Sequence, residues 1–87
     1  MPIKNQNRII KVIKYYKKGA SIRSIMRLSE SSYNDSITVV RSLIQSKKAT
    51  FINYKGQEVF NVGPTIPKTH KIKWRDNADN QNQMPRL

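Results

Sequence analysis

The sequence predicts one small α+β domain, mainly helical, in which three helices precede a two-stranded β-hairpin and an extended C-terminal tail. Apolar residues recur at three- and four-residue steps through the first half of the chain, which is the spacing of amphipathic helices. Two β-rich runs then flank Lys55-Gly56, a two-residue turn that ends in glycine. A chain of 87 residues has room for one such domain and little more.

A first amphipathic helix is expected between Asn5, as its N-cap, and Gly19, as its left-handed C-terminal residue. Its apolar face is expected to consist of Ile9, Val12, Ile13 and Tyr16. Its opposite face carries Lys11, Lys14 and Lys18. A solvated lysine face is the plain interpretation. The alternative is that these lysines lie along a nucleic-acid backbone.

A short second helix is expected from Ser21 to about Leu28. The Ser21 hydroxyl can cap it by accepting from a backbone N–H two or three residues on. Its inward face is predicted to comprise Ile22, Ile25 and Met26, and its outward face Arg23, Ser24 and Arg27. Serine and arginine side chains at a helix N-terminus are suited to phosphate contacts, because free backbone N–H groups already point outward there.

A third helix is expected from about Ser32 to Lys47, after a serine-rich turn without glycine, and Ser32 with Asp35 has capping-box spacing. Val39 is expected to point outward. The predicted inward stripe is Tyr33, Ile37, Val40 and Ile44, with Leu43 at its edge. The predicted exposed row is Asn34, Thr38, Arg41, Ser42 and Gln45. These residue types read base edges in DNA, whereas the plain alternative is a solvated polar face.

With Lys55-Gly56 as a two-residue turn, the hairpin register follows. It places Tyr54 opposite Gln57, Ile52 opposite Val59, and Phe51 opposite Phe60. The face predicted to close over the helices comprises Phe51, Phe60 and Val62. Lys55 must then adopt a positive φ, and its side chain is either a phosphate contact or part of an ordinary solvated turn.

Residues 64–87 are expected to be a proline-bracketed basic connector and an Asn/Gln-rich tail, largely disordered, outside a domain that spans residues 1–63. Ile72 and Trp74 alternate with basic residues near its middle. Three roles stay open for Trp74, the chain's one tryptophan. It packs on the domain's own surface, anchors a protein partner or second subunit, or inserts near nucleic acid.

Seventeen Lys and Arg residues against five Asp and Glu residues give a formal net charge of +12 and imply a polyanionic partner. The absence of cysteine excludes disulfides and thiolate metal sites. His70, the one histidine, lies in the expected tail, and neither a phosphate-cradling glycine loop nor a suitable carboxylate pair accompanies it. We therefore expect no enzyme, no metal and no cofactor. No apolar run suits a signal peptide or a membrane span, so the expected location is cytoplasmic and nucleoid-associated.

Over roughly residues 5–62, this order of helices and hairpin resembles the winged helix-turn-helix superfamily. The resemblance implies that the third helix enters the major groove while the hairpin flanks it. It implies base contacts from Asn34, Thr38, Arg41, Ser42 and Gln45. DNA-backbone contacts are expected from Ser21, Arg23, Arg27, Lys47, Lys48 and Lys55. The sequence departs from the pattern in its glycine-free turn and at Lys48, where such proteins often place a glycine.

The expected function is therefore that of a sequence-specific double-stranded DNA-binding protein, either a small transcriptional regulator or a DNA-architecture or replication accessory factor. The short Lys- and Asn-rich chain without an effector domain suits a phage or mobile element. A homodimer, or a protein partner bound through the tail, is compatible with this reading. Two alternatives stay open: a protein-binding adaptor or inhibitor acting on host transcription machinery, and an RNA-binding winged helix.

Overall fold

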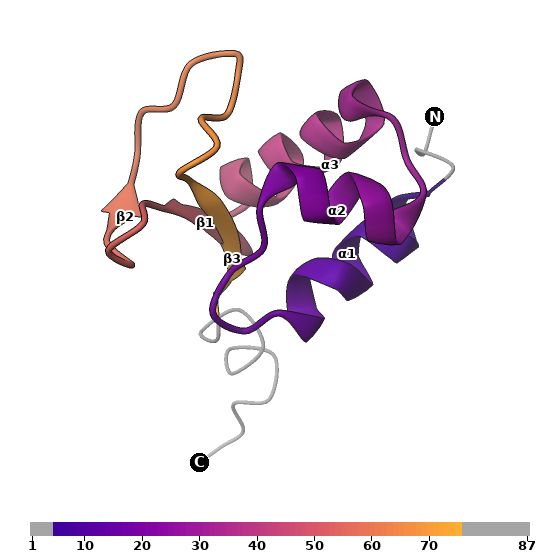
Figure 1. The fold of residues 1–87 in the computed structure, drawn as a ribbon, viewed down its shortest axis with the longest axis horizontal. Coiled ribbons are helices and arrows are strands. Elements are labelled where there is room, and N and C mark those ends of the chain that lie inside the picture. The colour runs from indigo at the N-terminus through magenta and orange to yellow at the C-terminus, as the bar shows by residue number, and fades with distance from the viewer. Residues whose placement is uncertain (1–4, 76–87) are drawn as a thin grey trace.

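The computed structural model describes residues 5–75, which form a mainly helical α+β fold. Three helices are followed by a small antiparallel sheet whose strands lie in the order β2-β1-β3 (Figure 1). The helices are α1 (Gln6–Tyr15), α2 (Ile22–Ser29) and α3 (Tyr33–Gln45). The strands are β1 (Ala49–Ile52), β2 (Glu58–Val59) and β3 (Lys71–Trp74). The three predicted helices are confirmed, and the strands after them form a three-stranded antiparallel sheet in place of the predicted two-stranded hairpin.

The N-terminal caps of α2 and α3 are those that the sequence predicts. The Ser21 hydroxyl accepts a hydrogen bond from the Ser24 backbone N–H at 3.1 Å, and the Ser32 hydroxyl accepts one from Asp35 at 3.1 Å. The cap of α1 differs, because the Asn5 side chain makes no capping bond there and its amide donates to the Glu30 carbonyl instead. Local capping chemistry therefore fixes where the two helices of the predicted helix-turn-helix begin.

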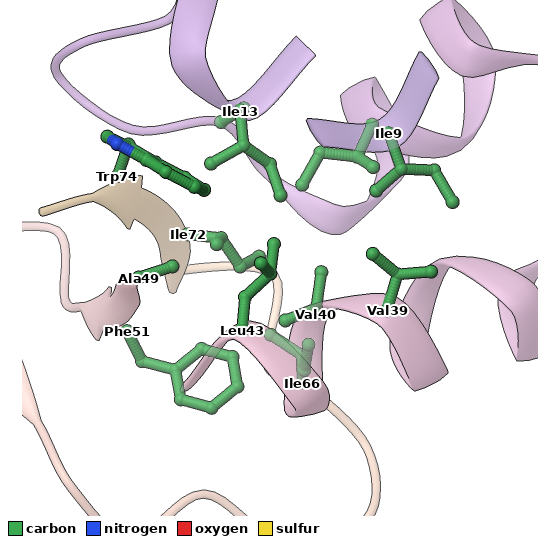
Figure 2. Packing of buried hydrophobic residues seen from close by; sticks show 12 residues of the cluster. Ile9, Ile13, Val39, Val40, Leu43, Ala49, Phe51, Ile66, Ile72 and Trp74 are labelled. Atoms are coloured by element: carbon green, nitrogen blue, oxygen red, sulfur yellow. The ribbon is translucent and has the colours of Figure 1, made fainter. Parts of the chain in front are cut away.

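The hydrophobic core lies between α1, α3 and one face of the sheet (Figure 2). Ile9 and Ile13 from α1 face the α3 side chains and the strand residues Ala49, Phe51 and Ile72. The buried face of α3 comprises Ser36, Val39, Val40 and Leu43. The expectation that Val39 points outward is therefore wrong, since this side chain is only 3% exposed. The polar Ser36 lies in the middle of the buried face, so a prediction from apolar residues alone centres the buried face on the wrong side of the helix.

The hairpin register also differs from the predicted one by one residue. Phe51 pairs with Val59 and Ile52 with Glu58, so Phe60 does not close over the helices and is 85% exposed. The loop is longer than the predicted two-residue turn, because Asn53 and Gln57 are joined by a backbone hydrogen bond across it. Within this loop only Gly56 takes a positive φ, at +82°. Lys55 keeps an ordinary conformation, and the strained two-residue turn that would demand a positive φ from this lysine is avoided.

Residues 71–74 form β3, which corrects the expectation of a largely disordered segment from residue 64 onward. β3 pairs along the whole of β1, from Ala49 opposite Trp74 to Ile52 opposite Lys71. On its other side Ile72 exchanges two backbone hydrogen bonds with Ala20, at 2.8 and 2.9 Å. The domain therefore extends at least to this strand. The Asn/Gln-rich tail expected at residues 76–87 lies outside the described residues.

Candidate nucleic-acid interface

One side of α3 presents a row of polar side chains, opposite its buried face. The exposed members of the predicted base-reading set are Asn34, Thr38, Ser42 and Gln45. They recur at three- or four-residue steps, so they lie in one line along the helix. The Thr38 hydroxyl donates to the Asn34 carbonyl at 2.7 Å, one turn earlier in the helix. Four of the five predicted base-reading residues therefore share one exposed surface, which we call the α3 polar row.

Arg41, the fifth residue of that set, is half-buried and already has a partner. Its guanidinium donates a hydrogen bond to the Gly63 carbonyl. On the same side of α3 the Tyr33 hydroxyl donates to the Pro64 carbonyl at 3.3 Å, and Ile66 is buried in the core. The connection from β2 to β3 therefore lies along one flank of α3 and borders the polar row. Apart from Ile66, no residue of this connection indicates the contact from sequence alone.

A chain of serine hydroxyls holds α3 against the end of α2. Ser29 and Ser36 are fully buried, and the Ser31 hydroxyl lies 2.6 Å from each of theirs. Ser29 also donates to the Ile25 carbonyl one turn earlier. Glu30 takes the left-handed conformation, with φ of 56°, at the place where a glycine is often found. A largely buried polar network therefore links the end of α2 to the first turns of α3.

The polar row runs into a group of cations at the C-terminal end of α3. Lys47 has a φ of +65°, and the Lys48 backbone N–H donates to the Leu43 carbonyl at 2.9 Å, which closes the helix end. Arg75 joins them because its N–H donates to the Lys48 carbonyl at 2.9 Å. Lys14 also lies nearby, with its Nζ atom 4.8 Å from the centroid of the Trp74 ring. We call Lys14, Lys47, Lys48 and Arg75 the basic end.

Acidic side chains do little to offset this charge. Residues 5–75 contain fifteen Lys and Arg residues but only three Asp and Glu residues. Two of the three carboxylates form ion pairs, Glu30 with Arg8 at 2.9 Å and Glu58 with Arg75 at 3.6 Å. The described part of the protein therefore presents a strongly positive surface to solvent, which attracts a polyanion.

The remaining predicted backbone contacts lie away from the basic end. Arg23 and Arg27 are exposed one turn apart on α2, whereas the Ser21 hydroxyl is half-buried and occupied in capping. Lys55 is exposed at the hairpin tip, with its Nζ atom 5.6 Å from the Tyr54 ring centroid. A shallow depression of about 290 Å³ connects the end of α3 to the hairpin, and its lining is Arg41, Ile44, Gln45 and Phe51.

Trp74 does not serve as an exposed partner anchor. Its side chain is 8% exposed and packs in the core beside Ala49 and Ile13 (Figure 2). The packing interpretation of this residue is therefore the correct one.

Exposed apolar side chains occur elsewhere, where sequence periodicity does not indicate them. An open apolar groove of about 310 Å³ between α1 and α2 is lined by Lys11, Val12, Tyr15, Tyr16 and Leu28.

Comparison of the chain with protein-family models, curated proteins and solved structures finds no match. Among residues 5–75, no group of three or more His, Cys, Asp or Glu side chains is placed to hold a metal ion. None of the helices in that part of the chain is long and apolar enough to cross a membrane. The candidate site is therefore defined by its own residues, namely the α3 polar row and the cations around it.

Proposed function

We propose that the protein binds double-stranded DNA sequence-specifically, with α3 in the major groove, in the manner of a winged helix-turn-helix protein. The observation that carries the proposal is the α3 polar row. Its amide and hydroxyl side chains are exposed on a helix whose opposite face is fixed in the core. Asn and Gln match adenine, and Ser and Thr pair with several bases. Lys47 and Lys48 follow the row in the chain and are exposed, and we expect them to contact phosphates at the groove edge.

The mechanism has two stages. The cations of the basic end, with Arg23 and Arg27 on α2, capture DNA through its phosphates in a salt-dependent step that carries no sequence information. The polar row then reads base edges once α3 lies in the groove. Arg41 is the strongest potential reader of guanine in the set, and in the proposed complex it exchanges the Gly63 carbonyl for a base. The contribution of Arg41 to binding is therefore the difference in free energy between its bond to a base and its bond to the Gly63 carbonyl.

The sheet fits this proposal with one modification. The β1–β2 hairpin supplies the flanking element, and Lys55 at its tip is placed for a phosphate contact. β3 adds a strand on the other side of β1 and ties the sheet to the link between α1 and α2 through Ala20. We propose a binding role rather than catalysis, as a transcriptional regulator or as a DNA-architecture or replication accessory factor.

Fluorescence anisotropy with a labelled DNA duplex, a duplex RNA of the same sequence and heparin tests the class of partner. Each titration is repeated over a range of salt concentrations. The proposal predicts tighter binding of the DNA duplex than of the RNA, with a logarithmic affinity that falls linearly with the logarithm of salt concentration. Preference for the RNA would favour the RNA-binding alternative. Equal affinity for all three polyanions would reduce the function to charge attraction and overturn readout by α3.

A protein-binding adaptor is the second candidate, and the apolar groove between α1 and α2 favours it. Tyr15 and Leu28 are exposed there, and Lys11 also lines the groove. A partner with a largely apolar surface would suit such a groove. Binding through this groove would depend weakly on salt, and Leu28→Ser would abolish it. DNA binding is expected to survive the same substitution.

A further inference from the structure

Two aromatic side chains at the β1–β2 hairpin are almost fully exposed. Tyr54, in the loop, is 74% exposed and Phe60, just after β2, is 85% exposed. Neither belongs to the α3 polar row or to the basic end. Rings of this size gain much from burial, so a small domain that leaves both in water has surface available for a planar apolar ligand.

The loop that carries Tyr54 is held rigidly by its own hydrogen bonds. The Asn53 side-chain oxygen accepts from the backbone N–H groups of Lys55 and Gln57, at 2.8 and 3.0 Å. The Asn53 amide donates to the Gln57 side chain at 3.2 Å, and the Gly56 N–H donates to the Asn53 carbonyl at 2.9 Å. Because the turn is already ordered, Tyr54 can bind a ligand without the entropic cost of fixing a loose loop.

The charge beside Tyr54 identifies the chemistry of the partner. Lys55 places its ammonium group 5.6 Å from the Tyr54 ring centroid, and residues 53–57 contain no carboxylate. An aromatic ring next to a cation, on a protein with this excess of basic residues, suits a base and its phosphate together. The faces of bases inside a paired duplex are covered by their neighbours. Unpaired bases leave their faces open to stacking.

We propose that Tyr54 and Phe60 stack on unpaired nucleobases, so that the protein prefers a duplex containing a short unpaired segment over a fully paired one. The proposal rests on the nucleic-acid binding proposed above and adds the structural class of its target. α3 holds the paired part in this arrangement, while the hairpin contacts the bases beside it. Lys55 contacts the phosphate that accompanies the stacked base.

The test compares two DNA duplexes of the same length that share one strand with 2-aminopurine at its centre. The complementary strand pairs throughout in one duplex and leaves a central unpaired bubble in the other. We expect the native protein to bind the bubble about tenfold more tightly, and its binding to change the 2-aminopurine fluorescence. Tyr54→Ala and Phe60→Ala are each expected to remove most of this preference, whereas Tyr54→Phe keeps it. Tyr15→Ala is the matched control, since this α1 tyrosine is 76% exposed and lies outside the hairpin.

Three results would overturn the inference, and they are distinguishable. Equal binding of the two duplexes by the native protein, or equal loss on both in the hairpin variants, removes the stacking proposal and leaves duplex binding intact. A fluorescence change from 2-aminopurine in the paired duplex, lost in Tyr54→Ala, would mean insertion into a paired step instead. Failure of the native protein to bind either duplex overturns the proposed function as well. Folding of each variant is checked by the fluorescence of the buried Trp74.

Discussion

The Arg41 guanidinium donates a hydrogen bond to the Gly63 carbonyl, so the residue best suited to reading guanine also fastens the β2–β3 connection to α3. Tyr33, eight residues earlier in α3, makes a similar contact, because its hydroxyl donates to the Pro64 carbonyl. These two contacts order the connection against α3 and place Ile66 in the core. Stability and the proposed DNA binding would therefore depend on the same side chain, and substitutions of Arg41 are expected to change both.

Arg41→Ala is expected to lower the free energy of unfolding by about 1 kcal/mol, because the Gly63 carbonyl loses its donor. Urea unfolding followed by Trp74 fluorescence measures this loss. Arg23→Ala serves as the control, since Arg23 is exposed on α2 and is expected to leave stability unchanged. Equal loss in the two variants would show that the Arg41 contact contributes nothing specific.

Arg41→Ala is also expected to lower discrimination between a specific site and random duplex, by about 1–3 kcal/mol. The loss arises because a contact to a base edge depends on which base is present, whereas a phosphate contact does not. Competition binding with both duplexes measures the ratio of affinities. An unchanged ratio, with equal loss on both duplexes, would contradict the role of Arg41 as a base reader.

Substituting Lys48→Ala is expected to weaken binding to every duplex by a similar factor. Its side chain belongs to the basic end, where one fewer phosphate contact lowers the slope of log affinity against log salt by about 1. Lys68→Ala is the matched control, because this exposed lysine lies in the β2–β3 connection outside the proposed interface. If both substitutions change the slope equally, charge acts over the whole surface and the basic end has no special position.

Ser31→Ala is expected to cost about 1–3 kcal/mol of stability, although this residue is neither apolar nor fully buried. It removes the hydroxyl that lies 2.6 Å from both Ser29 and Ser36, and the buried Ser36 hydroxyl then lacks a partner. Thermal or urea unfolding provides the measurement, with the exposed Ser42→Ala as control. A stability equal to that of the native protein would show that the serine chain does not hold α3.

Trp74→Ala is expected to cost about 3–5 kcal/mol and to unfold much of the protein at ordinary temperature. The ring is buried against α1 and β1, as Figure 2 shows. Phe60→Ala, at a ring that is almost fully exposed, is expected to cost little. Far-ultraviolet circular dichroism during heating compares the two. If Phe60→Ala lost more stability than Trp74→Ala, burial of Trp74 in the core and the assignment of β3 would both be contradicted.

Sequence reasoning succeeds in this protein where structure is determined locally. The caps at Ser21 and Ser32 depend on one hydroxyl and a backbone amide a few residues away, so their spacing alone predicts both helix starts. The members of the α3 polar row are exposed, as their residue types indicate. The Asn/Thr/Ser/Gln composition of that row was therefore available from the sequence, together with the cations that follow it.

Prediction fails where distant parts of the chain decide the outcome. Ser36 is buried because Ser31 satisfies its hydroxyl, and this turns the inward face of α3 toward Val39. The segment from residue 64 onward is polar and rich in proline, so its sequence does not indicate a folded structure. Within it, Ile72 and Trp74 are nevertheless buried, and their strand β3 pairs with the central strand β1. The hairpin register is wrong by one residue because an amide–backbone bond network at Asn53 favours a longer loop.

The central claim is that the α3 polar row reads DNA sequence. Binding selection from a random duplex pool at near-physiological salt, run in parallel with the native protein and with Gln45→Ala, tests it most directly. Gln45 is exposed in the row, so its substitution is expected to change stability little. The account predicts one enriched motif for the native protein and a loss of preference at one or two positions of that motif for Gln45→Ala. No enriched motif, or an identical motif from both proteins, would contradict sequence reading by α3.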